Sequence, residues 1–429
     1  MAEEGFIKFI WKYRLYKASS LYTSTGQRLV ILDPGEQNPH GGPDFLYARV
    51  RIDDLLWAGN VEIHSFASDW YRHRHHLNPA YNNVILHVVG SFDTDVTNSL
   101  GRRIPAMVPE YQAYLRRRYE ILKRNESWLP CGDFLKSISN TRLRHWLHCL
   151  SEDRIFHKSR NVEQILRNTA SGLDHALCRI LAPGYGLPLN TLPFEMLLNR
   201  IPLQVLIEHR HNQTDLEALL FGQSGLLFPA RTQGSYPSSL WKRYTALNMP
   251  FAHTPVPLHL WKFLRLRPPA FPTVRISQYA SLLHQRYPLS ESLLEFTSMG
   301  EMEQLFRVRA SEYWTSHYSF GKASPPLPKY PGRQFISTLI INVIVPFLTV
   351  LHKSENCRGA MLLAGQILQN LEAESNRIIR NWSIFGIRAE NAKESQALLQ
   401  LYHYYCKQKR CLECRIGTEI VRDAIHEFK

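Results

Sequence analysis

The stretches GPDF (residues 42–45) and GNVEIH (residues 59–64) decide the fold expected for the first part of the chain. They place Asp44 at the head of one strand and Glu62 on the next strand. His64 follows Glu62 by two residues and therefore lies on the same face. Two carboxylates on neighbouring strands beside a polar group form a compact site for a hard divalent cation.

The segments around these stretches predict a small α/β unit. Apolar residues recur at helical spacing near the N-terminus, and short alternating or continuous apolar runs that predict strands follow. The expected order is helix, three strands, helix and strand, over residues 4–16, 28–33, 44–52, 55–64, 70–75 and 83–92.

The remaining chain is predicted to be mainly helical, after a basic helix over residues 111–123. Helical periodicity continues to the C-terminal region and is interrupted by proline-rich breaks. We therefore expect an α/β head over residues 1–125 and a mainly helical domain over residues 126–429. The expected helices cover residues 141–168, 173–181, 192–209, 214–221, 276–287, 289–296, 300–306, 334–351, 358–371 and 394–406.

Net charge and hydropathy indicate which kinds of partner the protein is expected to bind. The net charge is +14, which favours polyanions such as nucleic acid, although a basic surface also serves solubility. The most apolar stretch, residues 335–351, includes Asn342 and Pro346 and is interpreted as a buried helix, so no membrane span is expected. The N-terminus lacks the basic-then-apolar order of a signal peptide, so we expect a cytoplasmic protein.

Pro43-Asp44, seventeen intervening residues and Glu62-Ile63-His64, set after a helix and before a helix and strand, resemble the PD-(D/E)XK nuclease superfamily. The resemblance implies that Asp44 and Glu62 bind one or two Mg²⁺ or Mn²⁺ ions. It implies that Glu4, on the first helix, completes the metal shell. A lysine usually stands where this chain has His64, so the expected catalytic set is Asp44, Glu62, His64 and Glu4.

The substitution at the lysine position leaves several roles open for His64. An imidazole can bind the metal or accept a proton, but it is not a permanent cation, so the site could also be catalytically inactive. His87 is either a further metal ligand or a core histidine, and His73 is expected on the solvated surface. The histidines of this region, which also include His75 and His76, suit Mn²⁺ or Zn²⁺ better than a carboxylate-only site does.

A second resemblance is to an uncharacterised bacterial family known only as a domain of unknown function. It brings no known activity. It rests on residues 59–64, 68–70, 73, 75–76, 79–81, 84–89, 267–268, 271–273, 275–276, 278, 395–398, 406, 411–414 and 416–417.

Three cysteines near the C-terminus, Cys406, Cys411 and Cys414, follow a C-x4-C-x2-C spacing. Three thiolates this close can bind zinc or an iron–sulfur cluster, given a fourth ligand. Candidates for the fourth ligand are Cys131, Cys357 and His403, and the alternative is three unligated thiols. Cations that could contact phosphates surround the triplet, namely Lys407, Lys409, Arg410 and Arg415.

The aromatic and basic segment around Trp261 adds Arg265, Arg267 and Arg275 as candidate phosphate contacts. The function expected from these observations is a metal-dependent nuclease acting on DNA or RNA, with a basic helical domain that binds nucleic acid. Two alternatives remain. One is a catalytically inactive nuclease fold that binds nucleic acid or acts as a scaffold. The other is a His/carboxylate metalloenzyme of another class.

Overall fold

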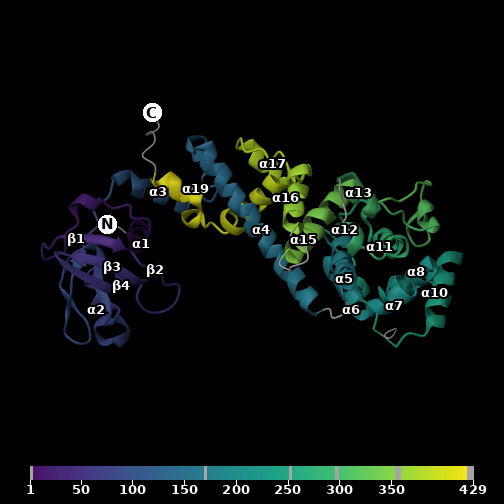
Figure 1. Cartoon of the computed structure of the whole chain (residues 1–429), viewed down its shortest axis with the longest axis horizontal. Helices are drawn as coiled ribbons and strands as arrows, with labels where there is room; N and C mark the ends of the chain where they lie inside the picture. The colour runs from purple at the N-terminus through teal and green to yellow at the C-terminus, as the bar shows by residue number, and fades with distance from the viewer. Residues whose placement is uncertain (1–2, 169–171, 251–253, 295–298, 353–358, 423–429) are drawn as a thin grey trace. The chain divides into compact units, whose positions relative to one another are not determined.

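The computed structural model describes residues 3–168, 172–250, 254–294, 299–352 and 359–422. It divides into two compact units (Figure 1): Met1–Trp146 together with Tyr402–Lys429, and Leu147–Leu401. The expected division at residue 125 therefore differs from the one found. The C-terminal segment groups with the α/β head because its last helix packs on a helix of the head.

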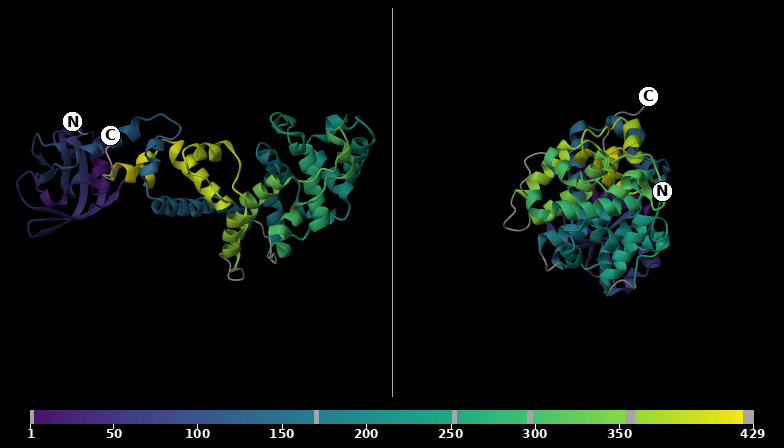
Figure 2. Two further views of the ribbon diagram at one scale, coloured as in Figure 1. Left: turned by 90° about the horizontal axis from the view of Figure 1, so that it is seen from above. Right: turned by 90° about the vertical axis from the view of Figure 1, so that its right-hand side faces the viewer.

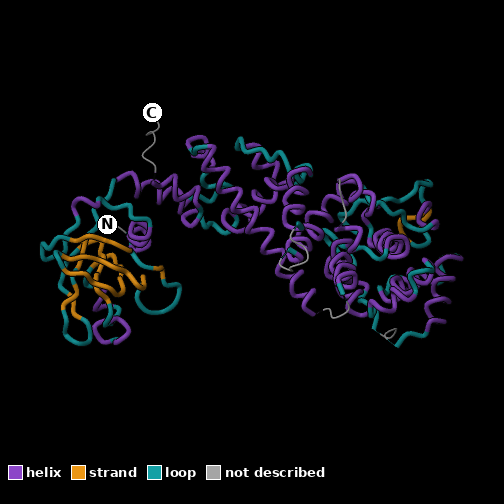
Figure 3. The backbone as a smooth tube through the Cα atoms, viewed as in Figure 1, coloured by secondary structure: helices purple, strands orange, loops and turns teal. Residues whose placement is uncertain are grey.

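A mixed sheet forms the centre of the first unit (Figure 3). The order is β1-β3-β4-β5-β8, and β2 also pairs with β3. The β1–β3 and β3–β4 pairs are antiparallel, whereas β4–β5 and β5–β8 are parallel. The strands are β1 (Leu29–Asp33), β2 (Glu36–Gln37), β3 (Phe45–Ile52), β4 (Leu55–Phe66), β5 (Val84–Ser91) and β8 (Ala106–Met107).

Helix α1 (Glu4–Lys12) packs against β4 and β5. Its apolar residues recur at helical spacing, so one stripe of the helix is buried, including Phe6, Ile10 and Trp11. Trp11 lies edge-on to Phe45, with ring centroids 6.5 Å apart. Phe45 pairs with Val61 in the sheet, so α1 covers the face opposite to the one on which Glu62 lies.

The connection between β4 and β5 covers the Glu62 face. It consists of α2 (Asp69–Arg72) and the 3₁₀ turns η2 (His75–Leu77) and η3 (Pro79–Tyr81). Trp70 and Tyr81 form a small apolar core there with Val84, Val96 and Ile104. The last two belong to the short pair β6 (Val96–Thr97) and β7 (Arg103–Ile104). Buried aromatic side chains thus fix this connection on the sheet.

The C-terminal segment completes the first unit. Helix α19 (Arg415–Arg422) lies beside α3 (Ala113–Arg124) (Figures 1 and 2). Arg118 donates to the Ile420 carbonyl at 3.0 Å, and Tyr114 donates to the Arg422 carbonyl at 3.2 Å. These bonds satisfy carbonyls that a helix end leaves without partners. The segment also contains the π-helical turn η9 (Tyr402–Cys406) and the 3₁₀ turn η10 (Cys411–Glu413).

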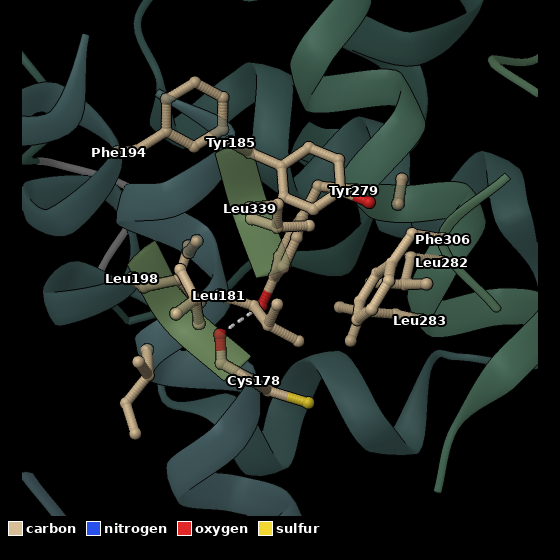
Figure 4. Packing of buried hydrophobic residues seen from close by; sticks show 14 of the residues in the cluster. Cys178, Leu181, Tyr185, Phe194, Leu198, Tyr279, Leu282, Leu283, Phe306 and Leu339 are labelled. Carbon is tan, nitrogen blue, oxygen red and sulfur yellow. Dashed lines mark hydrogen bonds between the residues drawn. The ribbon is translucent and has the colours of Figure 1, made fainter. Parts of the chain in front are cut away.

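The second unit is helical apart from a short hairpin, β9 (His317–Ser319) and β10 (Lys322–Ala323). One apolar core runs through it (Figure 4), where Tyr279 donates to the Cys178 carbonyl at 3.0 Å. Its larger helices are α4 (Asn140–Asn168, which starts in the first unit), α5 (Leu173–Tyr185), α6 (Thr191–Arg200), α7 (Leu203–Glu208), α8 (Gln213–Gln223), α10 (Ser235–Leu247), α11 (Pro272–Arg286), α13 (Met299–Phe306), α14 (Arg333–Leu339), α15 (Val345–Leu351), α16 (Ala360–Asn370), α17 (Arg377–Ile384) and α18 (Ala392–Leu401).

Several helix boundaries differ from the prediction. The expected helix over 192–209 is two helices, because Pro202 lacks an N–H and separates α6 from α7. A π-helical segment (Ile340–Ile344) interrupts the expected helix over 334–351. Helices α10 and α17 were not predicted. The helix ranges expected at 289–296 and 358–371 extend partly outside the described residues.

One helix among the described residues, Arg333–Leu351, is long and apolar enough to cross a membrane by length and composition. Of its most apolar window, 61% is buried. Core helices of globular proteins share this composition, so the helix is weak evidence for a membrane span.

Candidate metal centre

Glu62 and His64 lie on β4 and face the same side of the sheet. In the parallel register of β4 and β5, Glu62 pairs with His87, so the three side chains share one face. Glu62 is 5% exposed, His64 1% and His87 0%. Burying polar groups costs free energy unless they find partners. Their contacts therefore determine what this face can do.

Three histidines and Glu62 converge here. His64 Nε2 lies 3.1 Å from His73 Nδ1 and 3.5 Å from Glu62 Oε1. His75 Nε2 lies 3.3 Å from the same carboxylate oxygen. One ligand nitrogen from each of the three histidines lies within 4.8 Å of the other two, and only His73 of the three is exposed. The cluster therefore reaches solvent at His73.

The turn after α2 positions two of these histidines. Arg74, between His73 and His75, has φ 60° and ψ 29°, in the left-handed region that side chains other than those of Gly, Asn and Asp seldom adopt. The His75 ring stacks on Tyr81 with centroids 3.8 Å apart, and Trp70 contacts it edge-on at 5.3 Å. The turn and the two aromatic rings hold the His75 imidazole beside Glu62.

His87 lies behind His64, with His64 Nδ1 and His87 Nε2 2.8 Å apart. Burial and the neighbouring histidines lower the pKa of His64 to about 2. Burial, with His75, lowers the pKa of His87 to about 3. Both rings are therefore neutral at pH 7. When His64 donates its Nδ1 proton to His87, His64 Nε2 keeps a lone pair that can bind a metal ion.

Asp44 joins the cluster through Glu62. The Asp44 N–H donates to Glu62 Oε2 at 3.0 Å, and the Ile63 N–H donates to Asp44 Oδ2 at 3.1 Å. Lys8 Nζ, from α1, lies 2.6 Å from Asp44 Oδ1 and 2.8 Å from Glu4 Oε1. Because Glu4 and Lys8 are four residues apart, they lie one above the other on the helix.

The charged side chains around Asp44 shift one another's pKa values. Burial and the neighbouring Glu62 carboxylate raise the pKa of Asp44 to about 6, although Lys8 acts in the opposite direction. Burial lowers the pKa of Lys8, but its hydrogen bonds to Asp44 and Glu4 outweigh burial, and the net pKa is raised. Lys8 is therefore a permanent cation beside two carboxylates. Burial and the charges of Glu62 and Asp44 raise the pKa of Tyr81 to about 12.

The structure thus brings Asp44, Glu62, His64 and Glu4 into one region, as their sequence pattern indicated. It adds Lys8, which sequence reasoning did not consider, although its i+4 spacing from Glu4 was visible. His73 is exposed, as expected, and it belongs with His64 and His75 to the group whose ring nitrogens lie within 4.8 Å of one another. His76 lies outside that group, and its ring packs against Tyr71 with centroids 5.0 Å apart.

A family model with the description "Protein of unknown function (DUF2851)" matches residues 4–377. The chain belongs to this family. The predicted resemblance to an uncharacterised domain family is therefore confirmed. No curated protein and no solved structure matches the chain. The DUF2851 match includes every residue of the histidine and carboxylate cluster, and it ends before the C-terminal cysteines.

The cysteine triplet of this DUF2851 protein is buried, with Cys406 6%, Cys411 6% and Cys414 5% exposed. Cys131 is 7% exposed, and burial, with the neighbouring Cys414 and Cys411 thiols, raises the pKa of its thiol. Cys357 lies outside the described residues. His403 is exposed at the π-helical turn η9. Of the three candidates for a fourth ligand, Cys131 is therefore the one that the structure places with the triplet.

The expected phosphate contacts are placed unequally. Arg265, Arg267, Lys407, Lys409 and Arg415 are exposed. Arg410 is half-buried and pairs with Glu413. The prediction that Arg275 contacts phosphates is wrong. Its side chain is 6% exposed, donates to Gln278 at 2.8 Å and lies 3.4 Å from the centroid of the Phe335 ring. Its position in α11, a helix with buried residues on all sides, keeps it from a phosphate backbone.

Proposed function

We propose that this protein is a metal-dependent nuclease whose first unit is a PD-(D/E)XK-type head. The observation that carries the proposal is the convergence of Glu62, His64, His73 and His75 beside the Asp44–Lys8 pair. Phosphodiester hydrolysis requires an activated water and positive charge at the phosphate. A metal ion held by Glu62 and the three histidines would activate the water, and Lys8 would supply positive charge at the phosphate.

The metal would be held by Glu62 Oε1, His64 Nε2, His73 Nδ1 and His75 Nε2. Imidazole favours first-row transition metals, whereas carboxylates also accept Mg²⁺ and Mn²⁺. A mixed set of this kind suits Mn²⁺ or Zn²⁺. The neutral state of His64 supports this role, because a protonated imidazole cannot bind a metal. A bound cation would lower the pKa of a coordinated water and so supply the nucleophile.

Lys8 would take the role that a lysine at position 64 would have had. Its ammonium lies beside Asp44 but comes from α1 instead of β4. A fixed cation there would stabilise charge that develops on the phosphate oxygens. Asp44 would hold Lys8 in place and, with Glu4, offer carboxylates to a second divalent ion such as Mg²⁺ or Mn²⁺.

Nucleic acid would be the substrate because the protein carries an excess of cations, with a net charge of +14. Exposed basic residues lie in both units, among them Arg117 on α3 and Arg267 in the helical unit. Contacts of this kind to phosphates give affinity without sequence preference.

Metal binding is the first test. Purified protein is stripped with chelator, and Mn²⁺, Zn²⁺ and Mg²⁺ binding is measured by calorimetry for the native protein and for His75→Asn. The matched control is His76→Asn, since His76 is adjacent but outside the ligand group. We expect His75→Asn to weaken binding at least tenfold and His76→Asn to leave it unchanged. Equal affinity in all three proteins would contradict the ligand assignment.

Cleavage is the second test. Labelled single- and double-stranded DNA and RNA are incubated with each metal, and the rates are compared for native protein and Glu62→Gln. Glu36→Gln, an exposed carboxylate on β2, is the control. We expect cleavage that only Glu62→Gln abolishes. Salt-sensitive binding without cleavage under any metal would instead support an inactive nucleic-acid-binding protein.

The histidine cluster also favours one alternative, a His/carboxylate metalloenzyme of another class. Three imidazoles with one carboxylate are compatible with hydrolysis of other esters or amides. A stoichiometric metal that depends on His75, in a protein with neither cleavage nor nucleic-acid binding, would favour this alternative.

A further inference from the structure

The sheet face that carries Glu62 continues along β4 into a region that is open to solvent. Side chains alternate along the strand, so Ala58 and Asn60 share a face with Glu62 and His64. Ala58 is exposed and Asn60 is half-buried, whereas Glu62 and His64 are buried. Two residues along a strand span about 7 Å. The open part of this face therefore begins directly beside the histidine and carboxylate cluster.

A groove of about 500 Å³ lies on this open part. Tyr47 and Arg49 of β3, Ala58 and Asn60 of β4, and Asn83 just before β5 are among the residues that line it. Asp33 also lines it, and its carboxylate lies 3.4 Å from Arg49 Nη2. Asp33 and Arg49 are the only charged side chains among the described lining residues. Because their charges balance, the groove is polar and close to neutral.

Tyr47 lines the groove in an unfavourable backbone conformation. Its φ is 61°, in the left-handed region that a tyrosine seldom adopts. The cause is a β-bulge, since Leu46 and Tyr47 lie opposite the single residue Asn60. The Tyr47 N–H donates to Asn60 Oδ1 at 3.4 Å. Bulges of this kind re-aim a side chain, and strained backbone often marks a functional position.

The side chain of Tyr47 has no structural role that would account for this strain. It is 75% exposed, and its ring contacts no other aromatic ring in the described part of the chain. Asparagine or glycine would adopt the same backbone conformation at lower cost. An exposed aromatic ring beside a polar groove therefore offers a flat apolar surface to a ligand.

The strand order excludes one class of ligand. β3 lies between β1 and β4, and β4 lies between β3 and β5. Neither strand is an edge along the groove, so a peptide strand could not extend the sheet there. The ligand must instead be recognised by side chains.

A nucleobase matches these side chains. Its flat face stacks on an aromatic ring, and its edge carries donors and acceptors that the amides of Asn60 and Asn83 can pair with. A nucleobase is uncharged, as a nearly neutral groove requires. Within a duplex, neighbouring bases cover both faces of a base and its partner occupies the pairing edge. Only an unpaired base can therefore enter the groove.

We propose that this groove binds an unpaired nucleobase next to the phosphate that is cleaved, so that the substrate is single-stranded DNA or RNA. Tyr47 would be the residue that selects a single strand. The position of the phosphate rests on the proposed nuclease function, whereas binding of the base does not require cleavage. Every base has a face that can stack, so the groove would select strandedness more than sequence.

Strand preference is measured first, on the full-length native protein with chelator present so that nothing is cleaved. Fluorescence anisotropy gives the affinities for a labelled DNA single strand, the same sequence as RNA, and the DNA duplex. We expect at least one single strand to bind roughly tenfold more tightly than the duplex. Duplex binding that is equal or tighter, or no binding of either single strand, would overturn the proposal, and the comparison needs no variant.

Tyr47→Asn then tests the tyrosine. Because asparagine tolerates the left-handed backbone, thermal unfolding should show a variant at least as stable as native protein, so a loss of binding would not come from a loss of fold. We expect roughly tenfold weaker binding of the single strand. Tyr47→Phe keeps the ring and should bind as native protein does. So should Tyr22→Asn, which changes an exposed tyrosine outside the groove. Native affinity in Tyr47→Asn would refute the role of Tyr47.

Cleavage assays separate this proposal from the nuclease proposal. Cleavage of duplex alone, at a rate that Tyr47→Asn does not change, would overturn the groove assignment and leave the nuclease function standing. Binding of single strands that depends on Tyr47, without cleavage under any metal, would support the groove and contradict the nuclease function.

Discussion

Lys8 Nζ lies 2.6 Å from Asp44 Oδ1, so a lysine from the first helix sits beside the aspartate that precedes β3. The same ammonium contacts Glu4. A cation thus stands beside the acidic group even though His64 occupies the position expected for lysine. The proposed role of this cation can be separated experimentally from the proposed metal binding.

Lys8→Met should lower the cleavage rate by roughly 10²–10³-fold and leave metal affinity within a few fold, because a fixed cation stabilises charge mainly in the transition state. Single-turnover cleavage and calorimetric metal titration measure the two quantities. Lys12→Met, on the same helix, is the control. A Lys8→Met protein with native cleavage would remove lysine from the mechanism.

The partly buried Lys158 of α4 predicts a pH dependence in the helical unit. Its ammonium donates to Asn342 Oδ1 at 2.7 Å and to Gln396 Oε1 at 2.5 Å, and burial, with Arg154, lowers its pKa to about 7. The unfolded lysine titrates near 10.4, so between pH 7 and 10 the unfolded state binds more protons and stability rises with pH.

We expect the free energy of unfolding to gain roughly 1 kcal/mol per pH unit from this group above pH 7. Chemical denaturation at pH 7, 8 and 9 measures it, with Lys158→Met for comparison. The variant should show a flatter profile than native protein. Parallel profiles would mean that Lys158 keeps an ordinary pKa.

Gly417 lies directly against the backbone of Cys411. A Cβ at this position would come 1.9 Å from the Cys411 carbonyl oxygen, a backbone atom. Gly417→Ala should therefore destabilise the first unit by about 1–3 kcal/mol. Gly365→Ala in α16 is the matched control, since a Cβ there meets no described atom within 4 Å. It should be neutral or stabilising by up to about 1 kcal/mol. Thermal unfolding of both variants would expose an error in either assignment.

Arg265 and Arg267 are the exposed pair of the helical unit that we expect to contact phosphates. Changing both to Gln should weaken DNA binding and reduce the slope of log affinity against log salt by about 0.9 per lost contact. Affinities at three salt concentrations measure the slope. An unchanged slope would mean that Arg265 and Arg267 do not contact phosphates and are ordinary solvated surface residues.

The sequence anticipated the head well because alternation constrains strands strongly. Glu62 and His64 had to share a face, and the order of helices and strands followed from short apolar runs. The position of His73 beside His64 and His75 was not predictable, since it depends on the left-handed backbone at Arg74, which no residue pattern indicated. The sequence motif includes only the acidic member of this helical pair, Glu4, and therefore did not predict Lys8 as a site residue.

The helical unit was predicted less completely. Helix α10 contains serines and Pro237, which weaken its periodicity, and tertiary packing supplies its stability instead. Arg275 looked like a surface cation within a basic run, yet helix α11 is buried on all sides. Local composition does not report burial of this kind. The grouping of Cys131 with the triplet likewise depends on contacts across most of the chain.

The first unit is assembled from two stretches of chain, with Leu147–Leu401 between them. During synthesis at about 5–20 residues per second, roughly 10–50 s must pass before α19 can emerge and cover α3. The entropic cost of bringing the two stretches together grows only slowly with their separation in sequence. The separation therefore delays completion of the first unit more than it destabilises it. Throughout that interval the nascent head has an uncovered α3 and an unpartnered Cys131. The helical unit then has the opportunity to fold first, and chaperones that shield a waiting N-terminal domain become relevant to the yield of the protein.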